Sequence, residues 1–150
     1  TLRTLFPYTT LFRSMQSLRQ IEFALFDLSI HKATPALKAD QIQATLNQIR
    51  AQYAVLETTP YNRFQHSFSH IFAGGYAAGY YSYKWAEVLA SDAFDRFENE
   101  GIFNTATGKE FRQFILAVGG KDTALDAFIN FRGREPKIDA LLRHQGWTNR

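Results

Sequence analysis

Apolar residues recur along much of this chain with the three- and four-residue spacing of an amphipathic helix. After Met15 they stand at Leu18, Ile21, Leu25 and Leu28. Thr34-Pro35 interrupts this stripe, because proline cannot continue a helical hydrogen-bond ladder. A second helix is predicted near Asp40 and Gln43, whose spacing resembles a capping box. Its apolar stripe consists of Ile42, Leu46, Ile49 and Tyr53.

Glycines and capping residues divide the second half of the chain. A loop and then a short piece over residues 66–72, helical or extended, end at Gly74-Gly75. A long helix is predicted over roughly residues 77–100, since Gly101 occupies the position after a last helical turn that glycine favours. Further helices are predicted after Thr107, after Asp122 or Thr123, and at Pro136. With no alternating strand and no repeat, the sequence predicts an all-α fold of six or seven helices.

Composition adds limits to this picture. The chain has 150 residues and 45% hydrophobic content, enough for one domain with a core. It has no cysteine, which excludes a disulfide scaffold and a thiolate metal site. No apolar run approaches the ~18 residues that a membrane span needs, so no membrane partner is expected.

The first 14 residues account for most of the net charge of +3. Arg3 and Arg13 lie there without any acidic residue, and the rest of the chain has 15 basic against 14 acidic residues. Because these charges are interspersed, no basic stripe exists and nucleic acid is not an expected partner. We expect residues 1–14 to be a sequencing-adapter or cloning remnant outside the fold, and residues 15–150 to be the folded part.

Residues 70–85 combine a histidine, a glycine pair and four tyrosines. Glycine frees the backbone, and a tyrosine hydroxyl is a neutral hydrogen-bond donor at pH 7. On the predicted long helix, Tyr76, Tyr80 and Tyr83 share one face, which Glu87 extends. The opposite face, which includes Tyr81, Trp85 and Val88, is expected to be buried. This pattern fits a closing active site. Spacing alone favours the alternative, a helix whose tyrosines pack against a neighbour with each hydroxyl bonded at the edge.

Two other patterns suggest weaker sites. His66 and His70 are four residues apart, as in zinc peptidases, but Ser67 stands where those enzymes have glutamate, so a hydrogen-bonding role for His70 is preferred. His31 and His144 are isolated and are expected to be surface or capping residues. The segment Arg132–Pro136 is interpreted as a solvated turn with a local Arg–Glu pair, although its arginines could clamp a carboxylate.

Long runs of this sequence resemble the C-terminal part of the thimet oligopeptidase family of zinc metallopeptidases, and most of all its bacterial oligopeptidase A branch, with peptidyl-dipeptidases as relatives. The runs are Leu18–Asp27, Phe64–Tyr83, Trp85–Ala90, Phe97–Asn104 and Phe131–Pro136. The resemblance implies that the chain is the C-terminal part of a larger helical catalytic domain. It also implies short peptides as substrates and the cytoplasm as location.

The family's zinc-binding His-Glu-x-x-His motif is absent from this chain. The resemblance therefore implies zinc in the full-length enzyme, none bound here, and no peptide hydrolysis by this chain without the missing N-terminal part of the same polypeptide. It assigns catalytic roles to Tyr83, Tyr76 and His70, with the tyrosines donating to the oxyanion. It assigns substrate contacts to these three residues and to Gly74, Gly75 and Tyr80.

A different class of function is also compatible with the residues. A stand-alone all-α interaction module would use the same tyrosines as a docking face, because tyrosine is enriched at protein interfaces. The two hypotheses differ in whether the tyrosine hydroxyls contact a reacting peptide or only a partner protein.

Overall fold

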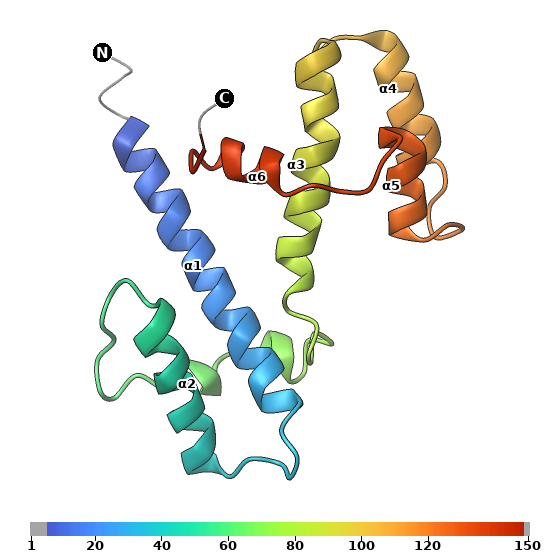
Figure 1. Cartoon of the computed structure of the whole chain (residues 1–150). Helices are drawn as coiled ribbons and strands as arrows, with labels where there is room; N and C mark the ends of the chain where they lie inside the picture. Colours follow the sequence, from blue (N-terminus) through green and yellow to red (C-terminus); the bar gives the residue numbers. More distant parts are fainter. Residues whose placement is uncertain (1–5, 149–150) are drawn as a thin grey trace. The chain divides into compact units, whose positions relative to one another are not determined.

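The computed structural model describes residues 6–148, with side chains from Arg13 onward. Within this part the chain forms six α-helices and no strand, so the predicted all-α class is confirmed (Figure 1). The helices are α1 Phe6–His31, α2 Ala39–Tyr53, α3 Ser82–Glu100, α4 Thr105–Phe111, α5 Ala124–Arg132 and α6 Asp139–His144. None of these described helices is long and apolar enough to cross a membrane.

Three shorter elements complete the chain. Two single 3-10 turns, Phe64–His66 and Ser69–Ile71, follow the loop after α2, and a π-helical turn, Arg112–Leu116, continues α4. The chain divides into two compact units, residues 1–84 and 85–150, so the boundary falls in the first turn of α3.

Several helices begin later or earlier than the sequence predicts. Helix α3 begins at Ser82 and not at residue 77, because Ala78 has a left-handed φ of 54° that no α-helix accommodates. Helix α2 begins at Ala39, one residue before the predicted cap. The side chain of Gln41, not that of Gln43, accepts the hydrogen bond of the Lys38 N–H (2.8 Å).

The capping residues of the later helices are partly as predicted. Thr123 caps α5 through its hydroxyl, which accepts from the Asp126 N–H, and this prediction is confirmed. Helix α4 is capped by Asn104, whose side chain accepts from the Ala106 N–H (2.9 Å). The predicted cap, Thr107, is buried inside that helix instead.

The core of unit 1 lies between α1, α2 and the turns before α3. Helices α1 and α2 run side by side in Figure 1, and an ion pair between Glu22 and Arg50 (2.9 Å) joins them. The buried apolar residues are Phe23, Ala24, Phe26, Leu46, Ile49, Phe68, Ile71 and Tyr80. The predicted stripe of α1 is therefore rotated, since Leu25 and Leu28 are only half-buried.

Helix α1 also bears on the predicted limit of the fold. It begins at Phe6, inside the segment 1–14 that the sequence places outside the folded part. Residues 1–5 lie outside the described residues, and the origin of the segment stays a prediction.

Unit 2 is organised around the carboxylate of Asp92 on α3, which is only 1% exposed. Arg132 donates to it through Nε (3.1 Å) and Nη2 (2.9 Å), and Arg134 through Nη1 (2.7 Å) and Nη2 (2.6 Å). The Lys137 N–H adds a fifth hydrogen bond (2.7 Å). Two arginines and a backbone amide thus satisfy the buried charge, as such a group requires.

This arrangement corrects the interpretation of residues 132–136 as a solvated turn with a local Arg–Glu pair. Gly133, with a φ of 71°, ends α5 and lets Arg132 and Arg134 approach the same carboxylate. The arginines clamp a carboxylate of their own chain. Beside them, Ala93, Phe128 and Phe131 form the buried apolar core of unit 2, and the half-buried rings of Phe97 and Phe111 pack against it.

The Asp92 network makes the stability of unit 2 depend on pH. Burial alone raises the pKa of Asp92, but the hydrogen bonds from Arg134 and Lys137 and the charges of both arginines bring it below its ordinary value of 3.8. Because folding lowers this pKa, the resulting stabilisation is complete above pH 3.8 and is lost as the pH falls through the folded value.

We predict that Asp92→Asn removes the stabilisation that is lost in acid, because Arg134 and Arg132 lose their buried partner and only Arg132 keeps another carboxylate, that of Asp95. The free energy of unfolding should fall by about 3–5 kcal/mol at neutral pH, as when one partner of a buried ion pair is lost. Thermal unfolding between pH 2 and 7 should show a flatter pH profile for this variant than for the unaltered chain. Glu57→Gln, at an exposed loop position, is the matched control and should keep the original profile.

Candidate functional site

Four predicted site residues of unit 1 form one cluster of rings. Tyr76 and Tyr83 stack with centroids 5.0 Å apart, and Tyr80 meets Tyr83 edge-on at 5.1 Å. The His70 ring lies 6.0–6.5 Å from all three tyrosine rings. The structure therefore brings together the histidine and tyrosines that the sequence singles out, although not on one helix.

Turns replace the helical face that the sequence predicts here. The Tyr76 N–H donates to the His70 carbonyl (3.0 Å), and the Gly79 N–H donates to the Tyr76 carbonyl (2.8 Å). Of the three tyrosines, only Tyr83 lies on α3. The predicted grouping of the three tyrosines is correct, but the predicted helix is not, because successive turns and not one helix bring these side chains together.

Gly74 and Gly75 shape this turn in different ways. A Cβ on Gly74 would lie 2.8 Å from the Cα and 2.9 Å from the carbonyl oxygen of His70, closer than real Cβ atoms approach. Gly75 has a φ of 79°, which L side chains rarely adopt. The glycine pair thus permits a tight backbone contact beside His70, a static role that the expectation of a freed backbone in a closing active site did not include.

A buried carboxylate that sequence reasoning missed holds the next part of the loop. Asp27 of α1 is fully buried and accepts hydrogen bonds from the Ala78 N–H through Oδ1 and from the Tyr80 N–H through Oδ2, both at 2.9 Å. His31 Nδ1 lies 2.7 Å from Oδ1 of the same carboxylate. His31 is therefore not isolated, because it is a partner of a buried acid, but it lies at the exposed end of α1 as expected.

Tyr80 is the buried member of the ring cluster, at 8% exposure. It packs against Phe23 and Phe68, and its hydroxyl donates to Gln20 Oε1 (3.0 Å). Burial raises the pKa of Tyr80, against the smaller opposing effects of Gln20 and Arg19. Tyr80 is thus a core residue beneath the site, and the predicted open face is formed by Tyr76 and Tyr83.

Tyr83 is the most exposed tyrosine of the cluster, at 39%. A hydrogen bond to Tyr76 raises the pKa of Tyr83, with burial and the neighbouring tyrosines acting in the same direction. The raised pKa keeps the Tyr83 hydroxyl protonated at neutral pH, where it can donate a hydrogen bond to a ligand.

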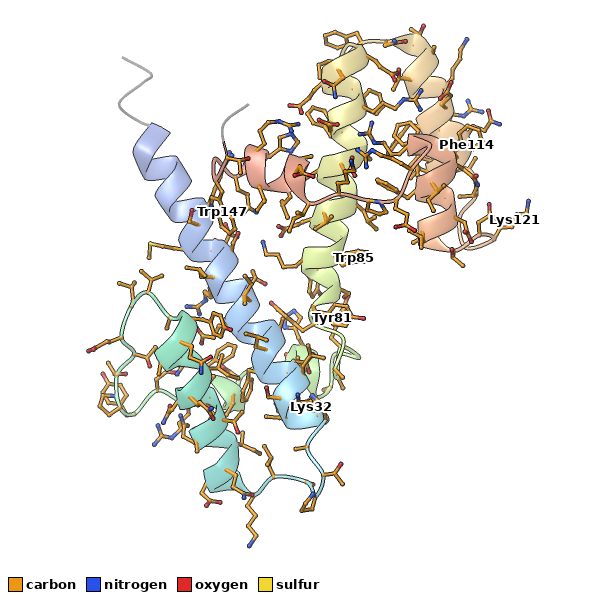
Figure 2. All side chains as sticks on the ribbon, in the orientation of Figure 1. Lys32, Tyr81, Trp85, Phe114, Lys121 and Trp147 are labelled. Atoms are coloured by element: carbon orange, nitrogen blue, oxygen red, sulfur yellow. The ribbon has the colours of Figure 1, made fainter. Side chains whose placement is uncertain are left out.

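The predicted buried face of α3 is only partly correct. Tyr81 and Trp85, both labelled in Figure 2, are 51% and 53% exposed in this chain. Val88 is buried as expected. Tyr81 precedes α3, so the helical wheel assigned it to a face of a helix that does not include it.

The two histidines that are four residues apart do not share a helix. His66 and His70 belong to two separate 3-10 turns, so their spacing places them on no common helical face. No group of three or more His, Cys, Asp or Glu that could hold a metal ion exists among the described residues. His144, expected to be isolated, lies 2.8 Å from Glu98 through Nε2.

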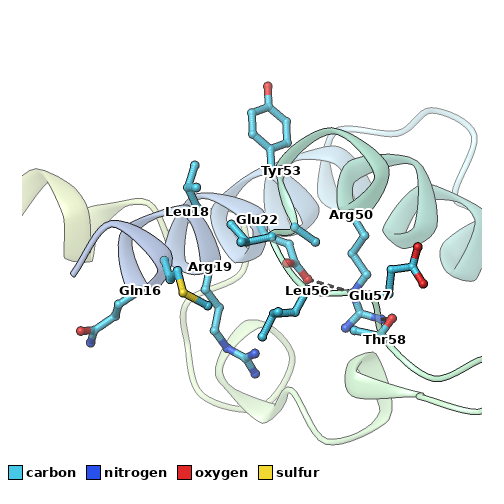
Figure 3. Close-up of a pocket in the computed structure, with 12 residues that line it drawn as sticks. Gln16, Leu18, Arg19, Glu22, Arg50, Tyr53, Leu56, Glu57 and Thr58 are labelled. Atoms are coloured by element: carbon cyan, nitrogen blue, oxygen red, sulfur yellow. Dashed lines mark hydrogen bonds and ion pairs between the residues drawn. The ribbon is translucent and has the colours of Figure 1, made fainter. Parts of the chain in front are cut away.

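A separate cavity of about 410 Å³ lies between α1 and the end of α2 (Figure 3). The ion-paired side chains of Glu22 and Arg50 line this cavity. Its other lining residues include Arg19, Tyr53 and Leu56. None of the predicted site residues lines this cavity. The ring cluster therefore remains the candidate site.

Comparison with known proteins identifies the family. A model of peptidase family M3 matches residues 1–147. The chain belongs to peptidase family M3. Oligopeptidase A of Haemophilus influenzae is 55% identical over 136 residues, which cover 91% of this chain and 20% of that protein.

Relatives with lower identity are also peptidases by name. A probable cytosolic oligopeptidase A of Arabidopsis thaliana is 49% identical over 87% of the chain and 19% of its own length. Dipeptidyl carboxypeptidase of Salmonella typhimurium is 36% identical over 82% of the chain and 18% of its own length. The chain thus spans about a fifth of the length of these curated relatives, and the resemblance to the oligopeptidase A branch is confirmed.

The hydrogen bond between the two stacked tyrosines can be tested by titration. We predict that Tyr76→Phe lowers the pKa of Tyr83 toward the ordinary tyrosine value of 10.0, because the Tyr76 hydroxyl that raises it is removed. The ¹³Cζ signal of Tyr83, followed by NMR from pH 8 to 12, measures this shift. Tyr61→Phe, at an exposed loop position, should leave it unchanged, and an unaltered Tyr83 titration in Tyr76→Phe would exclude the bond.

The close contact at Gly74 gives a second prediction. Gly74→Ala should destabilise unit 1 by about 1–3 kcal/mol, as overpacking does. The atoms that a Cβ would overlap belong to the backbone of His70, which cannot move aside as a flexible side chain could. Gly79→Ala is the matched control, since its Cβ would have an ordinary contact of 3.5 Å with the Tyr76 carbonyl oxygen. Urea denaturation of both variants makes the comparison. Equal stabilities would show that the loop accommodates a side chain at residue 74.

Proposed function

We propose that this chain is the part of a zinc-dependent oligopeptidase that stabilises the oxyanion and positions the peptide. Membership of family M3 supports peptide hydrolysis as the reaction of the complete protein. The observation that carries the assignment to these residues is the stacked pair of Tyr76 and Tyr83 at the surface of unit 1. A pair of neutral hydroxyl donors is what a developing oxyanion requires.

Both hydroxyls act as donors in this proposal. Tyr83 would donate its proton directly to the peptide oxygen, and its raised pKa keeps that hydroxyl protonated through the neutral range. Tyr76, whose ring stacks on that of Tyr83, would offer a second hydroxyl beside it. Together they would bind the oxygen of the scissile carbonyl as its negative charge develops.

His70 and the glycines would contact the substrate backbone beside that oxygen. The exposed imidazole lies 6.3 Å from the Tyr76 ring and 6.5 Å from the Tyr83 ring, between centroids, so it borders the same surface. A neutral imidazole can either donate to a peptide carbonyl or accept from a peptide N–H. Gly74 and Gly75 leave the backbone next to it uncovered by side chains.

The described residues do not fit zinc, since they contain no cluster of metal ligands. In the proposed enzyme the metal would be held by the missing N-terminal part of the polypeptide, and this chain alone would be inactive. Neither the tyrosines nor His70 would coordinate the metal in that enzyme. The names of the relatives include cytosolic and organellar proteins, so a cytoplasmic location stays a prediction.

The stand-alone interaction module remains the second candidate. The observation in its favour is the exposure of the large side chains of Tyr81 and Trp85. An interface would use these side chains for contact area. It would not need the hydrogen bond between Tyr76 and Tyr83.

A chimaera tests the proposal directly. Residues 15–147 replace the matching segment of Haemophilus influenzae oligopeptidase A, and hydrolysis of a fluorogenic peptide is measured. We predict that the chimaera is active and that Tyr83→Phe lowers kcat about 10²–10³-fold, the usual loss for one oxyanion donor. Removal of a single hydroxyl changes little else in the protein.

Tyr81→Phe is the matched control, because Tyr81 is exposed and makes no ring contact with the cluster in the described structure. Its kcat should match that of the unaltered chimaera. An inactive but folded chimaera, or equal kcat values for Tyr83→Phe and Tyr81→Phe, would contradict the proposed role and favour the interaction module.

A further inference from the structure

The loop that carries Tyr76 and Tyr80 is attached to α1 through one side chain. Asp27 accepts from the N–H groups of Ala78 and Tyr80, two residues apart, so amides of this turn converge on its carboxylate. Backbone amides arranged in this way form an anion-binding concavity. Here the anion is a side chain of the same unit.

This contact accounts for an unusual backbone conformation. Ala78 has a φ of 54° and is the non-glycine residue with positive φ in the described part of the chain. For a residue with a Cβ this conformation is unfavourable and persists only where its surroundings impose it. The hydrogen bond from the Ala78 N–H to the fully buried Asp27 supplies that constraint.

We propose that Asp27 is a positioning residue for the tyrosine pair, an inference that rests on the proposed function. Asp27 accepts hydrogen bonds from the loop backbone and does not contact Tyr76 or Tyr83 through these bonds. It would position the tyrosine pair through Tyr80, whose ring contacts Tyr83. The N–H of Tyr80 is fixed by Asp27, and the Tyr80 ring meets the Tyr83 ring at 5.1 Å and the His70 ring at 6.0 Å. Tyr76 lies two residues before Ala78, the first clamped residue, and stacks on Tyr83.

His31 completes the clamp from the same helix. Its Nδ1 lies 2.7 Å from Oδ1 of Asp27 and 2.9 Å from the Asp27 backbone carbonyl. Asp27 and His31 are four residues apart, so one turn of α1 orients both groups. The carboxylate is therefore held on one side by α1 and holds the loop on the other.

Asp27→Asn in the active chimaera tests the inference. The amide keeps the shape of the side chain but places an NH₂ group against a backbone N–H, so one clamp bond is lost. We expect kcat per folded molecule to fall on the order of 10–100-fold, as for a small misplacement of catalytic groups, with KM changed less than about threefold. The Tyr83 ¹³Cζ titration should also shift, since the tyrosine pair is displaced.

Two further variants separate positioning from a general loss of stability. Adding Ala78→Gly to Asp27→Asn should recover part of kcat, because glycine adopts a positive φ without the clamp. Adding Ala77→Gly, at an exposed neighbouring position, should recover none. The inference is overturned if both glycine variants recover kcat or if neither does. If Asp27→Asn alone does not fold, kcat is measured on the double variant with Ala78→Gly.

The outcomes distinguish this inference from the proposed function. If Tyr83→Phe lowers kcat but Asp27→Asn does not, the tyrosines are catalytic and Asp27 does not position them. If Tyr83→Phe itself has no effect on kcat, the proposed function fails first. A change of KM alone in Asp27→Asn would also overturn the positioning role.

Discussion

The architecture of unit 1 depends on a charge that water cannot reach. Desolvating a carboxylate is costly unless hydrogen bonds replace the water, and Asp27 obtains them from two backbone amides of a loop more than fifty residues away in sequence and from His31. Because the loop amides are distant along the chain, satisfying the charge requires the loop to dock on α1. One electrostatic requirement thus determines where the polypeptide turns before α3 and where the tyrosine rings are placed.

Asp92 satisfies the same requirement in unit 2 with different partners. Its carboxylate binds two arginines and the Lys137 N–H, so charge neutralises charge and the connection after α5 is tied to α3. Asp27 is instead met mainly by neutral amides. The arginines around Asp92 form a network of salt bridges between side chains. The amides around Asp27 fix the loop backbone instead, so the side chains of that loop stay available to a ligand.

Features that depend on neighbouring residues were predicted from the sequence, whereas features that depend on residues distant along the chain were not. Helix existence depends on local periodicity, and the all-α class and the cap at Thr123 were predicted correctly from it. The start of α3 was wrong, because the left-handed φ of Ala78 is imposed by Asp27, a contact that no local pattern contains. A signal did exist: an acidic residue at position 27, one place from the stripe residue Leu28, must find partners if that face is buried.

The candidate site shows the same division. Composition identified the residues around Gly74 and the tyrosines, because that mixture has no simple role in a core. It could not show that Tyr80 is buried beneath Tyr76 and Tyr83, nor that Gly74 is needed for contact with His70. These facts change the chemistry expected of the loop. A turn whose backbone is fixed by a buried carboxylate and by a steric contact at Gly74 presents its hydroxyls in advance of binding, and preorganised donors stabilise a transition state without reorganising during the reaction. Rigidity at the tyrosines, more than mobility at the glycines, is therefore the property that suits this segment to an oxyanion.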